Sequence, residues 1–148
     1  MDETHSKKEL VNNQAEQSIL PGVRRGLIAD AIDMPWAAIN EIRRIVSSPL
    51  FHLLFILHGI TPGKDWRIYG MPMIQRFRGS RIEIGDRALL RSWRSTNPLV
   101  PNHPVVLATR SSQAVIRIGE AVGMTGTTIV AVEQVEIGDR VFVGANVT

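Results

Sequence analysis

Apolar residues in the first third of the chain follow a helical spacing. After Pro21-Gly22 they recur three and four positions apart, at Ile28, Ile32, Trp36, Ile39, Ile42, Val46 and Leu50. Side chains at these spacings share one face of an α-helix. Aspartate before a proline is typical of a helix start, so the sequence predicts a helix from Met34-Pro35 with Asp33 as its cap. Residues 1–20 lack this spacing and are predicted to form a flexible tail.

A short, strongly apolar run follows, from Leu50 to Leu57, and we expect breaks before it at Pro49 and after it at Gly59. Eight residues are too few to span a bilayer. Two interpretations are open. The segment is a helix that packs on the end of the next domain, or it lies on a membrane surface with Arg43 and Arg44 near the headgroups. His52 and His58 are six positions apart, so they do not share a helical face and are interpreted as partly buried histidines, not metal ligands.

From Gly63 onward the spacing changes to six. Three segments are near copies of one another, at residues 82–87 (IEIGDR), 116–121 (IRIGEA) and 135–140 (VEIGDR). Aliphatic residues recur six apart, and glycines follow several of them. The pairs and series are Ile68 and Ile74; Ile84 and Leu90; Ile118, Met124 and Val130; and Ile137 and Val143, with glycines at 85, 119, 138 and 144.

A period of six fits neither a helix nor a flat strand. It fits a coil with flat sides, in which each side points one aliphatic residue at the axis and a small residue lets the backbone turn the corner. Stacked coils would pair through parallel strands. Ile118 and Ile137 are 19 positions apart, which predicts three sides of six and one extra residue near Glu133-Gln134. The domains are therefore a tail (1–20), a helical segment that is a cap or a membrane-surface helix (21–62), and a repeat region (63–148).

Residues 66–148 resemble the hexapeptide-repeat acyltransferases, most closely the branch of sugar O-acetyltransferases and polysaccharide-cluster acyltransferases. The most specific part is residues 116–148, which end in IGDRVFVGANVT, and the segment IYGMP at residues 68–72 also matches. The resemblance implies a mainly β fold, a left-handed parallel β-helix, incomplete at its C-terminal end and preceded by the helical segment. It also implies a homotrimer with active sites between subunits.

By this resemblance the chain is an acyltransferase that moves an acyl group from acetyl-CoA, or another acyl-CoA, to a hydroxyl of a sugar or polysaccharide precursor. Such a reaction needs a general base and donors for the oxyanion. The family's catalytic His follows the run that ends at Thr148, so the catalytic residue is unknown here, and a chain complete at this point is expected to show weak or no acyl transfer.

Four residues are candidates for binding. The resemblance assigns Ala145 to the cofactor and Thr125 to the position where related enzymes often have an acceptor-binding Asn. Thr125 has a second interpretation, in which it lines the outer face with Thr127 and Thr128. His103, beside Asn102, lies in a proline-rich insertion between Leu90 and Ile116, away from the family's catalytic position. Either this pair contacts the acceptor, or the segment is a loop fixed by Pro98, Pro101 and Pro104 without such a role.

Composition and charge bear on which partners and which chemistry are expected. The net charge is +3, and 14 of the 17 basic residues are Arg, six of them between Arg76 and Arg94. They alternate with apolar residues and form no nucleic-acid motif, so no nucleic-acid partner is expected; they are either a solvated strand face or a surface that attracts anions. The chain has no Cys, which excludes thiol catalysis and thiolate zinc sites.

The N-terminus is polar and unlike a signal peptide, so a cytoplasmic location is expected, with the inner face of the membrane as a further possibility. Four His residues do not supply the ligands of a metal-dependent carbonic anhydrase of the same fold, and no metal is expected. The alternative function is a non-catalytic assembly or membrane-docking protein.

Overall fold

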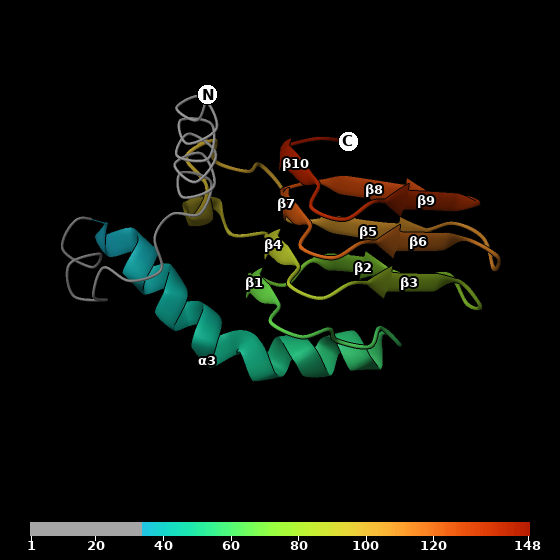
Figure 1. Cartoon of the computed structure of the whole chain (residues 1–148), viewed down its shortest axis with the longest axis horizontal. Helices are drawn as coiled ribbons and strands as arrows, with labels where there is room; N and C mark the ends of the chain where they lie inside the picture. Colours follow the sequence, from blue (N-terminus) through green and yellow to red (C-terminus); the bar gives the residue numbers. More distant parts are fainter. Residues whose placement is uncertain (1–33) are drawn as a thin grey trace, which may run out of the picture. The chain divides into compact units, whose positions relative to one another are not determined.

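A computed structural model of the protein describes residues 34–148 (Figure 1). The expected tail, the helical spacing up to Ile32 and the Asp33 cap lie outside these residues. The described part begins with helix α3 (Pro35–Leu57) and continues into ten short strands. They are β1 (Arg67–Tyr69), β2 (Met73–Gln75), β3 (Arg81–Ile84), β4 (Leu89–Arg91), β5 (Val106–Thr109), β6 (Val115–Ile118), β7 (Gly123–Thr125), β8 (Thr128–Ala131), β9 (Gln134–Ile137) and β10 (Phe142–Ala145), with a 3₁₀ turn η1 (Arg94–Thr96) after β4.

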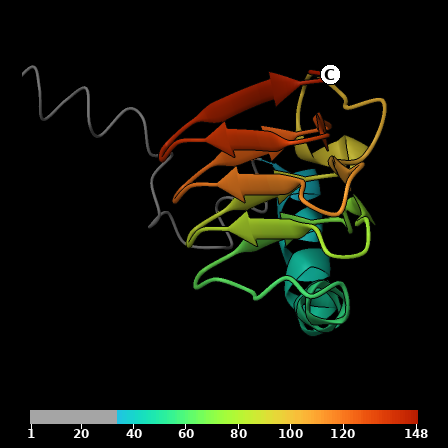
Figure 2. The same cartoon turned by 90° about the vertical axis from the view of Figure 1, so that its right-hand side faces the viewer.

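The strands form three parallel sheets, which the chain enters in turn. The first sheet has the order β1-β4-β7-β10, the second β2-β5-β8 and the third β3-β6-β9. Each strand therefore pairs with the strand three places later in the sequence, and Figure 2 shows them stacked one above another. We call each passage through the three sheets a coil. This arrangement, a helix followed by parallel strands in three stacked sheets, is consistent with the β-helix-like fold expected from the six-residue period.

Aliphatic columns fill the space between the sheets. Ile68, Leu90, Met124 and Val143 are in register in the first sheet; Ile74, Leu107 and Ile129 in the second; Ile84, Ile118 and Ile137 in the third. Most of these side chains are buried, and Leu90 and Leu107 are fully so. Stacked identical positions thus make one continuous core.

The inward position of the second sheet differs from the prediction. Ile129, not Val130, pairs with Leu107 and is buried, while Val130 is 47% exposed. From Met124 to Ile129 the chain uses five residues, and from Ile129 to Ile137 it uses eight. The single extra residue expected near Glu133-Gln134 is therefore the net result of one residue fewer before β8 and two more after it.

The glycines of the repeat serve close stacking and not, as expected, the turn itself. A Cβ added at Gly85 would lie 2.7 Å from the backbone carbon of Gly119, and one at Gly119 would lie 2.7 Å from that of Gly138. The bend is made two residues later, where Arg87, Ala121 and Arg140 have φ of 56°, 54° and 57°. Left-handed backbone at non-glycine residues is uncommon, and here it recurs once per coil.

Aspartates of the repeat link neighbouring coils at the same corner. The Asp86 carboxylate accepts a hydrogen bond of 2.9 Å from the backbone N–H of Lys64, and the Asp139 carboxylate accepts one of 2.7 Å from that of Glu120. Lys64 lies just before β1 and Glu120 just before β7, so each donor stands at the same corner one level earlier in the stack. The Gly-Asp dipeptide therefore combines a close approach with a partner for an otherwise unpaired N–H group.

Helix α3 packs on the first coil with one face. Phe51 and Phe55 are buried, and the ring centroids of Phe55 and Trp66 lie 5.0 Å apart. The expected break at Pro49 is wrong, because the helix continues through this residue. His52 and His58 are half-buried, and the Nδ1 of each lies 2.7 Å from the carbonyl oxygen four residues earlier. Within residues 34–148, α3 is not apolar enough along its length to cross a bilayer.

Glu41 ties the helix to the first sheet. Its carboxylate accepts hydrogen bonds from the Arg44 guanidinium and, at 2.7 Å, from the Tyr69 hydroxyl. The bond with Arg44, aided by Tyr69, lowers the pKa of Glu41 although its burial acts in the opposite direction. Burial and the bond to Glu41 in turn raise the pKa of Tyr69. The ionised form of Glu41 is thus the form that the folded state prefers.

We predict that this bond makes stability depend on pH. The pKa of Glu41 is lower in the folded state than its ordinary 4.5, so its stabilisation is present above that value and is lost as the pH falls through the lowered one. Glu41→Gln should cost about 1 kcal/mol at pH 7, and the difference from wild type should shrink toward pH 3 in urea unfolding. Glu83→Gln, in the exposed pair with Arg117, is the control and should cost less. A loss that is independent of pH would contradict the prediction.

We also predict that a single methyl group at the stacked corner destabilises the protein. Gly85→Ala places its Cβ against the backbone of Gly119, and overpacking of this kind costs typically about 1–3 kcal/mol. Gly138→Ala is the matched control, since nothing lies within 4 Å of its added Cβ. Thermal unfolding should show a lower Tm for the first variant and little change for the second; equal Tm values would show that the coils can separate at no cost.

Candidate functional site

The four residues proposed from the sequence come together at one corner of the coils, between the first and second sheets. Ala145 of β10 is in register with Thr125 of β7. The next residue, Asn146, accepts a 2.8 Å hydrogen bond from the backbone N–H of Asn102. A Cβ added at Gly126 would lie 2.9 Å from the carbonyl oxygen of His103. We call this place the loop corner.

The insertion between β4 and β5 extends to the loop corner, and its two ends are joined by a hydrogen bond. The backbone N–H of Val105 donates to the hydroxyl of Ser92 at 3.1 Å, which closes the segment from Ser92 to Val105. Along this segment the Asn97 amide donates to the Thr125 hydroxyl at 3.3 Å. The loop is therefore fixed to the strands at its base and at its middle.

Helix α3 holds the same loop from the other side. The Asn40 amide donates to the carbonyl oxygen of Ser95 at 2.8 Å and accepts from the Ser95 hydroxyl at 2.7 Å. Asn40 is only 4% exposed, although Ser95 itself is exposed, so the buried amide finds its partners at the edge of the loop, and leaving it unpaired would be costly. The helix thus positions the loop as well as covering the first coil.

Thr125 is buried beneath this loop and is only 5% exposed. Thr125 follows the inward Met124 in β7, so it lies on the outer side of the strand, as in the second interpretation, but the loop covers it. Thr127 is also buried, at 2%, and Thr128 is half-buried. The Thr127 hydroxyl donates to the carbonyl oxygen of Thr125 at 3.2 Å. These hydroxyls therefore organise the corner from within.

His103 is half-buried and has one ring nitrogen engaged. Its Nδ1 lies 2.8 Å from the carbonyl oxygen of Pro104. A carbonyl oxygen only accepts, so Nδ1 carries the proton and Nε2 carries the lone pair in the neutral ring. Nε2 can therefore accept a hydrogen bond from a hydroxyl. Asn102 is exposed beside it and adds an amide that both donates and accepts.

A cation lies one coil below Thr125. Arg91 of β4 is in register with it, and the backbone N–H of Gly126 donates to the carbonyl oxygen of Arg91 at 3.0 Å. Burial lowers the pKa of the Arg91 guanidinium, although an arginine keeps its charge at neutral pH. Among residues 34–148, no acidic group lies within 4 Å of it. The loop corner therefore carries positive charge that an anion would offset.

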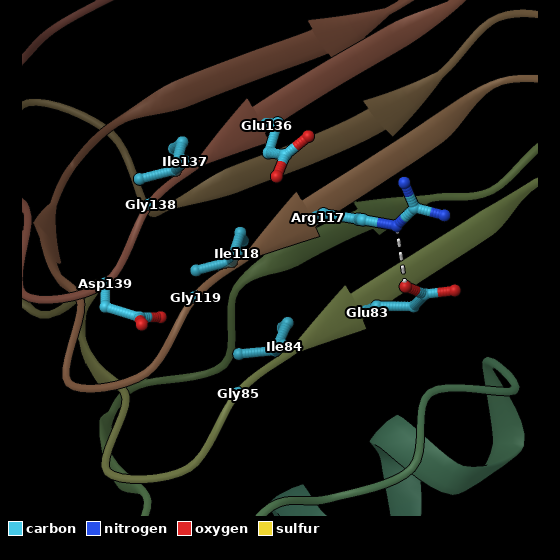
Figure 3. A pocket seen from close by; sticks show the side chains of 10 residues that line it. All are labelled: Glu83, Ile84, Gly85, Arg117, Ile118, Gly119, Glu136, Ile137, Gly138 and Asp139. Carbon is cyan, nitrogen blue, oxygen red and sulfur yellow. Dashed lines mark hydrogen bonds and ion pairs between the residues drawn. The ribbon is translucent and has the colours of Figure 1, made fainter.

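A separate groove of about 460 Å³ runs along the third sheet, beside the stacked glycines (Figure 3). Gly85, Gly119 and Gly138 are among the residues that line it. Its rim carries the ion pair between Arg117 and Glu83, at 3.1 Å, with further carboxylates in the next coil. Acidic side chains outnumber the single cation, so the groove suits hydroxyl groups better than phosphates. In the described part of the chain, no cluster of three metal-ligating side chains occurs.

Sequence reasoning missed two residues of the loop corner, Asn97 and Asn146. Asn97 precedes a proline, and Asn146 has a positive φ of 63°, a conformation in which Asn is several-fold enriched. The positive φ of Asn146 cannot be read from the sequence, which shows only an Asn just after an expected strand. Comparison with known proteins adds no further residues, because no family model, no curated protein and no solved structure matches the chain.

We predict that Asn40 controls the loop from a distance. Asn40→Ala removes both bonds to Ser95, each worth about 0.5–1.5 kcal/mol. Trypsin should then cut after Arg94, beside Ser95, several-fold faster than in wild type under native conditions, because the loop opens more often. Asn102→Ala is the control, since its side chain is exposed and only its backbone is used. Unchanged cleavage in Asn40→Ala would mean that the strands alone hold the loop.

Proposed function

We propose that this protein is an acyltransferase of the hexapeptide-repeat kind, with a left-handed parallel β-helix, that transfers an acyl group from coenzyme A to a hydroxyl of a sugar or polysaccharide precursor. The proposal includes a homotrimer and a cytoplasmic location. Its support is the six-residue period together with three parallel sheets that the chain enters in turn.

One observation supports the function more than the fold does. The resemblance and the sequence pattern nominate Asn102, His103, Thr125 and Ala145 from three separate segments, and these segments meet at the loop corner. Strand stacking accounts for the pairing of Thr125 with Ala145. The insertion that carries Asn102 and His103 lies outside the core columns, and its return to these strands is not needed to close the coils. A binding site is the simplest use of such a meeting point.

The reaction sets out what each group would do. The acceptor hydroxyl attacks the thioester carbonyl, the C–O bond forms, the C–S bond breaks, and the hydroxyl proton ends on the departing thiolate. In this proposal His103 Nε2 and the Asn102 amide bind and orient the acceptor, which is a positioning role. We assign the general base to none of the described residues.

The corner also fits the co-substrate better than the groove does. Coenzyme A carries several phosphates, and Arg91, with no acidic partner within 4 Å among the described residues, supplies charge of the required sign. Ala145 is small and half-exposed beside Thr125, which leaves room for an acyl chain. The groove, in contrast, presents Glu83 and Glu136, which repel phosphates.

We predict that coenzyme A binds at the loop corner, and titration calorimetry with acetyl-CoA tests this. The wild-type protein should bind with a Kd below about 1 mM, the upper end of ordinary KM values. Ala145→Trp fills the space beside Thr125 and should weaken binding at least about tenfold. Arg91→Gln removes one charge partner and should weaken it about five- to tenfold.

Val132→Trp is the matched control. Val132 is 62% exposed in the connection between β8 and β9, away from the loop corner, and its substitution should leave the Kd unchanged. Circular dichroism confirms that each variant folds. Absence of binding by the folded wild-type protein would reject the acyltransferase and favour the alternative, a non-catalytic assembly or membrane-docking protein. If acetyl-CoA binds with the same Kd to wild type, Ala145→Trp and Arg91→Gln, its site is not the loop corner.

A further inference from the structure

The side of α3 that faces away from the coils is apolar along its length. Eight aliphatic side chains there are each between 53% and 75% exposed, and we call them the apolar face of α3. They are Ile39, Ile42, Ile45, Val46, Leu50, Leu53, Ile56 and Leu57. At about 100° per residue they span about 140° of the helix surface, and no charged residue falls within that arc.

Single exposed aliphatic residues are normal, but a continuous face of them indicates a partner. The buried face of the helix, with Phe51 and Phe55, already serves the core, so the outer residues are not needed for folding. A helix with one long apolar face that does not span a bilayer is suited to lie in the interface plane, with its side chains among the acyl chains.

The positive charge of the described residues is concentrated in the helix and the first coil. Residues 34–84, which run from α3 through β3, hold seven Lys or Arg against three acidic residues, whereas residues 85–148 hold six against five. Most of the positive excess therefore lies in the helix and the first coil. A surface of this kind is attracted to anionic headgroups, at about 1 kcal/mol for each basic residue close to the membrane.

The loop between β2 and β3 places an aromatic residue and cations beside the end of the helix. The Arg76 guanidinium donates to the carbonyl oxygen of His58, just after α3, at 2.6 Å. Phe77, the next residue, is 50% exposed, and Arg78 and Arg81 follow. The backbone N–H of Phe77 donates to the Thr109 hydroxyl at 2.8 Å, so the loop is fixed in this position. An exposed phenylalanine beside arginines fits a surface that places apolar side chains among acyl chains and basic ones on headgroups.

These cations replace the pair expected from the sequence. Arg44 is occupied by its bond with Glu41, and the Arg43 guanidinium lies 5.7 Å from the Trp93 ring centroid, against the loop of the site. The cations free to meet headgroups are thus those of the first coil, near the end of the helix, and not those of the helix itself.

We propose that the apolar face of α3 docks on a bilayer that contains anionic lipids, with the β2–β3 loop on the headgroups. A second copy of the chain is a poorer occupant, because two surfaces with the same positive excess repel each other. The proposal does not rest on acyl transfer: it holds or fails whether or not coenzyme A binds.

Co-sedimentation of the whole protein with vesicles tests the docking. One set of vesicles is neutral phosphatidylcholine, and the other contains about 30 mol% of the anionic lipid phosphatidylglycerol, so that the two differ in surface charge. We expect binding to the anionic vesicles that weakens as salt is raised, and at least about tenfold weaker binding to the neutral ones.

Two pairs of variants locate the contact. Leu53→Glu puts a charge in the apolar face and should weaken binding at least about tenfold, while Val132→Glu, at a similarly exposed residue on a later coil, should have no effect. Arg78→Gln should weaken binding about fivefold, the factor for one interfacial cation. Arg110→Gln, at an exposed arginine after β5, should leave it unchanged.

Light scattering, which measures the oligomeric mass, distinguishes docking on a bilayer from docking on a second copy of the chain. If the folded wild-type protein ignores anionic vesicles, the proposal is wrong. It is also wrong if Leu53→Glu leaves vesicle binding intact but lowers the oligomeric mass, because the face then serves a second copy. Equal loss of binding in Val132→Glu and Leu53→Glu would show that charge repulsion alone, and not this face, explains the result.

Discussion

Successive coils pair strand on strand, and at one corner their backbones approach until no Cβ fits between them. Gly85 and Gly119 occupy that corner, and aspartate carboxylates accept N–H groups of the neighbouring coil beside them. This spacing sets the register of all three sheets. Because the register is common, the aliphatic residues fall into columns and the core is continuous. The positions of the loop and of the helix both follow from it.

At the loop corner, regular stacked strands hold a loop that lies outside the repeat. The insertion after β4 leaves the coil at Ser92 and returns at Val105, and polar bonds to α3 and to β7 hold it between. Rigid strands below and a clamped loop above are suited to hold side chains in a fixed geometry for binding. The loop brings His103 to strands that carry Thr125 and Ala145, and one coil below them Arg91 supplies charge. The proposed function depends on this combination and not on any one of its residues.

Helix α3 has two unlike faces, and each has a separate role. The face with Phe51 and Phe55 covers the aliphatic columns of the first coil, where they would otherwise meet water. Asn40 on the same side also holds the loop. The opposite face is equally apolar but has no partner within the described residues. Together with the positive excess of the first coil, it connects the fold to a membrane surface in our proposal.

The six-residue period alone was enough to predict parallel strands in stacked sheets, because a repeated inward aliphatic residue needs a repeated backbone. The start of α3 at Pro35 was also predictable from local preference. Three features were not: the inward choice of Ile129 over Val130, the helix through Pro49, and the real function of the glycines. Each is decided by what lies against the residue in space. The meeting of Asn102, His103, Thr125 and Ala145 is likewise tertiary, since only stacking brings residues 43 positions apart into one corner.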